Sequence, residues 1–141
     1  MDNWLMNNSG GSGFPGVAFE SIGATIVGRI AADPRPVDTQ YGERLVIDLE
    51  ADARSTATVG DDRHHPEQGE MVTLWIKPGS QARALRDALA AAKVDGLRVG
   101  DTLAVAYHAD GDKKPGMNPA KLYRAEYSAA VPAVPVSESL L

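Results

Sequence analysis

The strongest constraint on the fold is the segment Met71–Lys77, in which aliphatic side chains occupy every second position. Positions 72, 74 and 76 are aliphatic, and the second set contains Trp75 and Lys77. A period of two places the two sets on opposite faces of a β-strand, so the aliphatic set is predicted to face a core. The other face then holds an indole beside an ammonium group, which suits a flat anionic ligand. The alternative is that Trp75 is an ordinary packing residue.

Four other segments also have the composition and alternation of strands, at residues 24–31, 44–50, 101–108 and 121–127. The first contains Gly28, which is typical of a bulge or a bend. An alanine-rich helix is predicted at 81–93, between the third and fourth strands, with Ser80 as its N-cap and Gly96 beyond its C-terminus. The order β-β-β-α-β-β predicts an OB-fold, a five-stranded barrel with one helix between strands 3 and 4, although other small α+β folds can use this order.

The remaining segments are predicted to be connections or tails. Prolines at 34 and 36 are expected to end the ladder after the first strand, because proline cannot donate to it. Residues 51–70 form a polar connection without periodicity, predicted to be an exposed and mobile loop. Glycine, serine and proline content divides the chain into a flexible N-terminal arm (1–22), an OB-fold domain (23–128) and a disordered C-terminal tail (129–141).

Composition limits the possible functions. The chain has no cysteine, which excludes disulfides and thiolate metal sites and suits the cytoplasm. No apolar run approaches the roughly 20 residues that cross a bilayer, and no signal peptide is evident, so no membrane contact is expected. The net charge of -5 argues against nucleic acid. All 14 Lys and Arg residues lie between Arg29 and Arg124, however, so their placement can still create a basic groove.

A surface that combines aromatic rings with cations is the candidate site. Single-stranded nucleic acid is bound by aromatic faces that stack on bases and by cations along the backbone. In the predicted barrel, the ligand face is built around strands 2 and 3 and the loops beside them. The candidate nucleic-acid-binding residues are Arg29, Arg44, Trp75, Lys77, Lys113, Lys114, Lys121, Tyr123 and Tyr127. The competing interpretation is that the rings belong to the core and the lysines are merely solvated.

Patterns that indicate catalysis are missing from the sequence. It contains no phosphate-binding loop with a Lys-Ser/Thr pair and no Gly-x-Ser-x-Gly motif. The acids and histidines of residues 61–67 lack the spacing of a metal site. We therefore expect no enzyme activity, cofactor or metal. A protein-binding OB-fold module, for example an inhibitor or adaptor of another factor, is the alternative to a nucleic-acid-binding one.

Three segments also resemble a known family: residues 13–30, residues 72–77 with the helix that follows, and residues 114–127, where Asn118–Tyr123 is the most specific part. They are similar to the small OB-fold single-stranded DNA-binding proteins of tailed phages that infect actinobacteria. The resemblance implies a protein that coats exposed strands without sequence preference during phage DNA replication or recombination, in the host cytoplasm. A homo-oligomer, with replication or recombination proteins as further partners, is expected. Bacterial single-strand binders commonly end in an acidic tip, whereas residues 136–141 contain one acid, so recruitment through the tail is in doubt.

Overall fold

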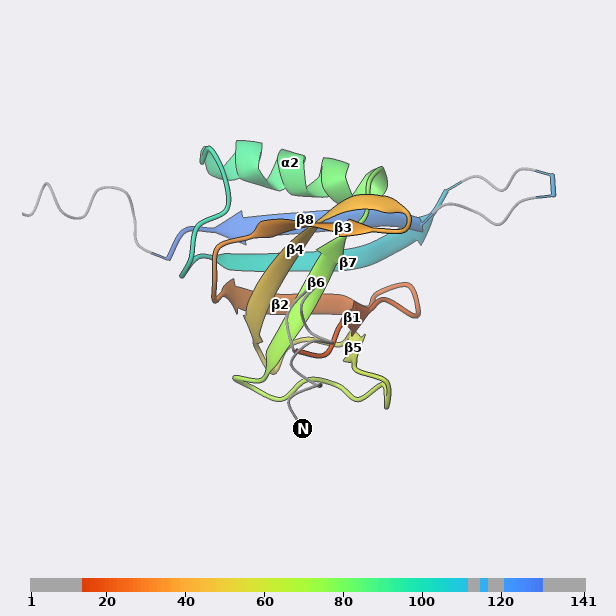
Figure 1. The fold of residues 1–141 in the computed structure, drawn as a ribbon, viewed down its shortest axis with the longest axis horizontal. Helices are drawn as coiled ribbons and strands as arrows, with labels where there is room; N and C mark the ends of the chain where they lie inside the picture. Colours follow the sequence, from red (N-terminus) through yellow and green to blue (C-terminus); the bar gives the residue numbers. More distant parts are fainter. Residues whose placement is uncertain (1–13, 112–114, 117–120, 131–141) are drawn as a thin grey trace, which may run out of the picture.

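The computed structural model describes residues 14–111, 115–116 and 121–130, and Figure 1 shows their arrangement. These residues form a mainly β structure with one helix. The elements follow in the order β1 (Val17–Ala18), β2 (Thr25–Ile30), β3 (Arg35–Thr39), β4 (Gly42–Ala51), β5 (Thr58–Val59), β6 (Met71–Ile76), α2 (Ser80–Ala92), β7 (Thr102–Asp110) and β8 (Lys121–Ser128).

The long strand β4 organises the larger sheet. One of its edges pairs with β3 and then with β2, and its other edge pairs with β6, so that Val46 lies between Arg35 and Trp75. Strand β2 continues to β7, and β7 to β8, and every ladder is antiparallel. Strands β1 and β5 form a separate two-stranded sheet.

The sheet does not close into a barrel. No ladder joins β6 to β8 in the described part of the chain, so the predicted five-stranded OB-fold barrel is not confirmed. Backbone N–H groups on these two edges donate to other partners: Thr73 to the Pro15 carbonyl (2.9 Å), Lys77 to Gln81 Oε1 (2.7 Å) and Tyr123 to Ser80 Oγ (2.8 Å). The N-terminal segment and the start of α2 thus take hydrogen bonds that a β6–β8 ladder would use. Helix α2 follows β6 in the chain and lies along β8 (Figure 1).

The predicted alternation is confirmed in the core. The aliphatic side chains of β6, at positions 72, 74 and 76, are all buried. The other strands contribute Ile26, Ile30, Ile47, Leu49, Leu103 and Val105, each 2% exposed or less. Continued back to residue 22, the alternation of the first strand would place Ile22 on the face of Ile26, but Ile22 is 58% exposed. The chain turns at Gly23, whose φ of 100° favours glycine, before β2 begins.

Residues 35–39 form a strand where a break was predicted. Strand β3 contains Pro36, which lies opposite Leu45. The alternation of hydrogen bonds in β4 directs the backbone groups of Leu45 toward β6, so Pro36 faces the outer edge, where a missing N–H costs little. The alternation of residues 44–50 places Asp48 on the outward face of its strand, yet Asp48 is not exposed. Its carboxylate is buried and accepts hydrogen bonds from Arg35 Nη1 and Thr73 Oγ1, both at 3.1 Å.

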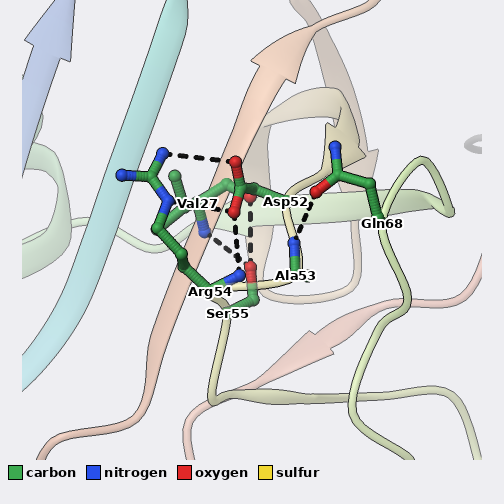
Figure 2. Close-up of polar contacts among 6 residues, drawn as sticks. All are labelled: Val27, Asp52, Ala53, Arg54, Ser55 and Gln68. Atoms are coloured by element: carbon green, nitrogen blue, oxygen red, sulfur yellow. Dashed lines mark hydrogen bonds and ion pairs between the residues drawn. The ribbon is translucent and has the colours of Figure 1, made fainter.

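The first part of the segment 51–70 is held against the sheet, contrary to the predicted loop, whereas residues 61–63 and 67–69 are exposed as predicted. Ser55 Oγ accepts a hydrogen bond from the Val27 N–H (2.9 Å) and donates to the Val27 carbonyl (3.1 Å). Figure 2 shows these contacts together with the Arg54–Asp52 ion pair and the hydrogen bond from the Ala53 N–H to Gln68. Ala57 and Val59 of this segment are almost fully buried. Polar contacts to β2 and two apolar anchors therefore fix a segment that has no periodicity.

The ends of α2 differ from the predicted caps. Gly79 is the N-cap residue, and the Ser80 hydroxyl instead accepts the Tyr123 N–H. At the C-terminus, Lys93 adopts the left-handed conformation (φ 59°), so the helix ends before Gly96. Part of the predicted arm also belongs to the folded body, because β1 pairs with β5 and Phe19 is buried. The rest of the arm (1–13) and the tail from residue 131 lie outside the described residues.

Candidate functional site

The open edges of β6 and β8 border a pocket of about 460 Å³. Five parts of the chain meet there: the segment that contains β1, the connection between β5 and β6, the end of β6, the first turn of α2, and β8. Its lining residues are Val17, Ala18, Phe19, Glu20, Arg63, Trp75, Lys77, Gln81, Lys121 and Tyr123. The pocket thus brings together four of the predicted site residues: Trp75, Lys77, Lys121 and Tyr123.

Trp75 of β6 and Lys77, the residue that follows the strand, line the pocket because the aliphatic side chains of β6 face the core. Trp75 is half-buried and Lys77 is exposed. Gln81 fixes the end of the strand, since its side-chain oxygen accepts the Lys77 N–H. The face predicted from the sequence therefore exists, although its middle, at Thr73, is buried.

An aromatic cluster forms the opposite wall. The Tyr123 ring meets Phe19 edge to face, with 5.3 Å between centroids, and lies 5.8 Å from the Tyr107 ring. Burial raises the pKa of Tyr123, against the opposing effect of a hydrogen bond with Gln81. A hydrogen bond to Asp110 raises the pKa of Tyr107 to about 12. Both phenols are therefore neutral near pH 7, and Tyr123 offers a partly buried ring at the pocket.

The pocket carries three cations and one acid in a chain that is acidic overall. Lys121 Nζ donates to the Phe19 carbonyl (3.2 Å) and lies 5.1 Å from the centroid of the Tyr107 ring, within cation–π range. Arg63 forms an ion pair with Glu20, the acid of the lining. Lys77 and Lys121 are both exposed, so their charge is available to a ligand phosphate.

The other predicted site residues lie elsewhere. Arg29 pairs with Glu50 (2.6 Å), and an Arg44 nitrogen donates to the carbonyl of its neighbour Glu43. Tyr127 is 8% exposed and is fixed by polar contacts outside the pocket. Lys113 and Lys114 fall outside the described residues.

The sequence did not indicate Gln81, Phe19 or Glu20 as site residues, and it indicated Arg63 only as a weak phosphate contact beside His64 and His65. Arg63 reaches the pocket from the 51–70 segment, whose fixed position follows from long-range contacts. Gln81 had a weak local signal, because a side chain in the first turn of a helix can bond to the strand that precedes it. The clustering of the other two depends on how the N-terminal segment packs.

The histidine region forms a hydrogen-bonded cluster. His64 Nδ1 lies 2.6 Å from Asp62 Oδ1, and its Nε2 lies 2.7 Å from Glu70 Oε2. The hydrogen bonds with Asp62 and then Glu70 raise the pKa of His64, and the same bonds lower the pKa values of the two carboxyls. Both ring nitrogens are thereby engaged. Among the residues that the structure describes, no group of His, Cys, Asp and Glu is arranged to hold a metal ion.

Comparison with known proteins gives no match: neither a family model, nor a curated protein, nor a solved structure corresponds to this chain. None of its described helices has the length and apolar character needed to cross a membrane. The pocket itself is therefore the feature from which a function can be inferred. Its rings and cations are suited to holding a flat, anionic ligand by stacking and charge.

Proposed function

We propose that this protein binds single-stranded DNA, without catalysing a reaction, through the pocket between β6 and β8. The observation that carries the proposal is the meeting of Trp75 and Tyr123 with Lys77, Lys121 and Arg63 in one pocket. Stacking on an aromatic ring contributes roughly 1–3 kcal/mol per base, and it tolerates any base because each has a π-face. The cations would neutralise the phosphates between the stacked bases.

We further propose that the fold is an open variant of the OB-fold. The order β2, β4, β6, α2, β7, β8 matches that fold, and the pairing of β4 with β2 and β6 supports the assignment. On this proposal, β3 is an addition to the loop between the first two barrel strands. From the sequence resemblance we also propose a homo-oligomer that coats exposed strands in phage DNA replication or recombination, in the host cytoplasm.

Fluorescence anisotropy of labelled oligo-dT tests the proposal. Affinity should fall as salt rises from about 50 to about 200 mM. If three pocket cations contact phosphates, the slope of log K against log salt should be about −2, from roughly −0.7 per contact on a single strand. Absence of binding at low salt would refute the proposal.

Two tryptophan variants locate the site. Trp75→Ala should weaken oligo-dT binding roughly 5- to 150-fold, the equivalent of one lost stacking contact. Trp4→Ala is the matched control, because it removes the other tryptophan of the chain, which the proposed site does not include. Circular dichroism of both variants checks the fold. Equal effects of the two changes would show that the stacking surface is misplaced.

A protein-binding module is the second candidate function. The net charge of -5 favours it, and so does β3, whose outer edge pairs with no strand in the described part of the chain. An open strand edge can accept an extended peptide. Failure of oligo-dT to bind would favour this candidate.

A further inference from the structure

The backbone of Trp75 points into the gap between β6 and β8. In an antiparallel ladder, residues of one strand alternate between bonding to the partner strand and facing away from it. Thr73 donates its N–H to Pro15 and Lys77 donates to Gln81, so both face away from β4. Trp75 lies between them and shares their direction. Within the described residues, no backbone contact outside the β4 ladder reaches its N–H or its carbonyl.

The free part of this edge is one residue long. On one side, the N-terminal segment bridges Thr73 through Gly16. On the other side, the Gln81 side chain closes the edge at Lys77 (2.7 Å). A peptide strand needs several consecutive free positions to add to a sheet. A single planar group with one donor and one acceptor fits the space better than a peptide does.

Such a group is present on every nucleobase. The N–H and carbonyl of an extended residue lie side by side and point the same way, as one donor and one acceptor. The Watson–Crick edges of adenine, cytosine, guanine and thymine each place an acceptor beside a donor. These edges are free in a single strand and are occupied in a duplex. A backbone donor–acceptor pair can therefore accept any unpaired base and reject a paired one.

We propose that the Trp75 backbone binds the Watson–Crick edge of one unpaired base in the pocket. This inference rests on the proposed function and adds to it the way in which the protein distinguishes single-stranded from double-stranded DNA. The rings of Trp75 and Tyr123 and the ammonium groups of Lys77 and Lys121 line the same pocket. Stacking and charge hold the strand there, and the hydrogen bonds require that the base be unpaired.

An isosteric oligomer separates this inference from the proposed function. Replacing thymine by difluorotoluene keeps the shape, the phosphates and the π-face of each base but removes its hydrogen bonding. We expect the difluorotoluene oligomer to bind about tenfold more weakly than oligo-dT, because the hydrogen bonds between one base and the Trp75 backbone are lost. Oligo-dU has the same Watson–Crick edge as oligo-dT and serves as the control, with an affinity within about threefold.

The amide resonance of Trp75 gives a second, site-specific measurement. In nitrogen–proton NMR spectra, oligo-dT should move this resonance downfield and slow its hydrogen exchange, and the difluorotoluene oligomer should do neither. The Leu74 amide faces β4 and should not respond to either oligomer. If both oligomers bind equally and leave the Trp75 amide unchanged, this inference is overturned and the proposed function stands. If oligo-dT does not bind, both are wrong. Displacement of oligo-dT by extended peptides, without protection of the Trp75 amide, would also overturn the inference.

Discussion

Tyr127 provides the sharpest distinction between a binding residue and a structural one. It shares a face of β8 with Tyr123, yet its hydroxyl donates to Asp101 Oδ2 (2.5 Å) and accepts the Arg98 N–H (2.9 Å). The Asp101 carboxylate also accepts hydrogen bonds from the Ala130 N–H and from Arg98 Nε. Tyr127→Phe should therefore destabilise the fold and leave DNA binding intact.

The size of the expected loss of stability follows from the polar groups that Tyr127→Phe leaves without the hydroxyl. Both Tyr127 and Asp101 are buried, at 8% and 4% exposure, so solvent does not replace the lost hydroxyl well. A hydrogen bond to a charged group contributes about 1.5–3 kcal/mol. Asp101 keeps its bonds to Ala130 and Arg98, which prevents the larger cost of an unpaired buried charge. We expect the free energy of unfolding to fall by about 2 kcal/mol at pH 7.

The loss should depend on pH in a stated direction. Burial alone would raise the pKa of Asp101, but the hydrogen bonds from Tyr127, Ala130 and Arg98 outweigh burial and lower it. A carboxyl with a lowered folded pKa contributes stability above its unfolded pKa of about 4, and that stability is lost as pH falls through the folded value. The difference between wild type and Tyr127→Phe should therefore shrink below about pH 4.

Urea denaturation followed by circular dichroism measures this free energy, and anisotropy with oligo-dT measures binding. Tyr41→Phe is the matched control, because Tyr41 is 75% exposed in the turn between β3 and β4 and should be silent in both assays. If Tyr127→Phe unfolds like wild type but binds oligo-dT tenfold more weakly, then Tyr127 contacts the ligand and the structural assignment is wrong.

Three further changes test other parts of the structure. Gly28→Ala should lower the free energy of unfolding, measured by urea denaturation, by about 1–3 kcal/mol, because the added Cβ would lie 2.9 Å from the Glu50 carbonyl oxygen. Gly96→Ala is the control, because a Cβ there meets open space. Equal stability of the two variants would contradict the close approach at Gly28. The pKa of His64 is raised in the folded protein, so His64 contributes stability below its unfolded pKa of about 6.5, and this stability is lost as pH rises through the folded pKa. In denaturation curves recorded across this pH range, His64→Gln should reduce the fall of the unfolding free energy with pH, and the control His65→Gln should leave the fall unchanged. Lys121→Gln should reduce the salt slope of oligo-dT binding by about 0.7, whereas an unchanged slope would place Lys121 away from the phosphates.

The face of each strand could be predicted from the sequence, because a period of two in aliphatic residues identifies the side that is buried. This pattern placed Trp75 and Lys77 on one face at the end of β6, and Lys121 and Tyr123 together on β8. It did not distinguish Tyr123 from Tyr127, which share the same face of β8. What separates them is the surroundings at each end of the strand, where Tyr123 meets the pocket and Tyr127 meets Asp101.

Local sequence patterns could not predict the ion pairs or the packing of segments that are distant in the sequence. Arg29 has the exposed position expected for a ligand contact, but the ladder register places Glu50 opposite it. The register depends on the whole sheet, so the residues of β2 alone do not indicate that Glu50 neutralises Arg29. Arg63 is the converse case. It lies in a segment without periodicity, and its ion pair with Glu20 depends on the position of that segment, which contacts between β2 and Ser55 help to fix.

The open sheet and the candidate site have one common cause. Had β6 and β8 paired, the Trp75 N–H and carbonyl would be used in the ladder, and no pocket could form between the two strands. The edges stay apart because Pro15, Gln81 and Ser80 supply single hydrogen bonds at the positions where a ladder would form. Each of these bonds joins one residue to one other, which leaves no periodic trace in the sequence. The strands could therefore be predicted, whereas the gap between them could not.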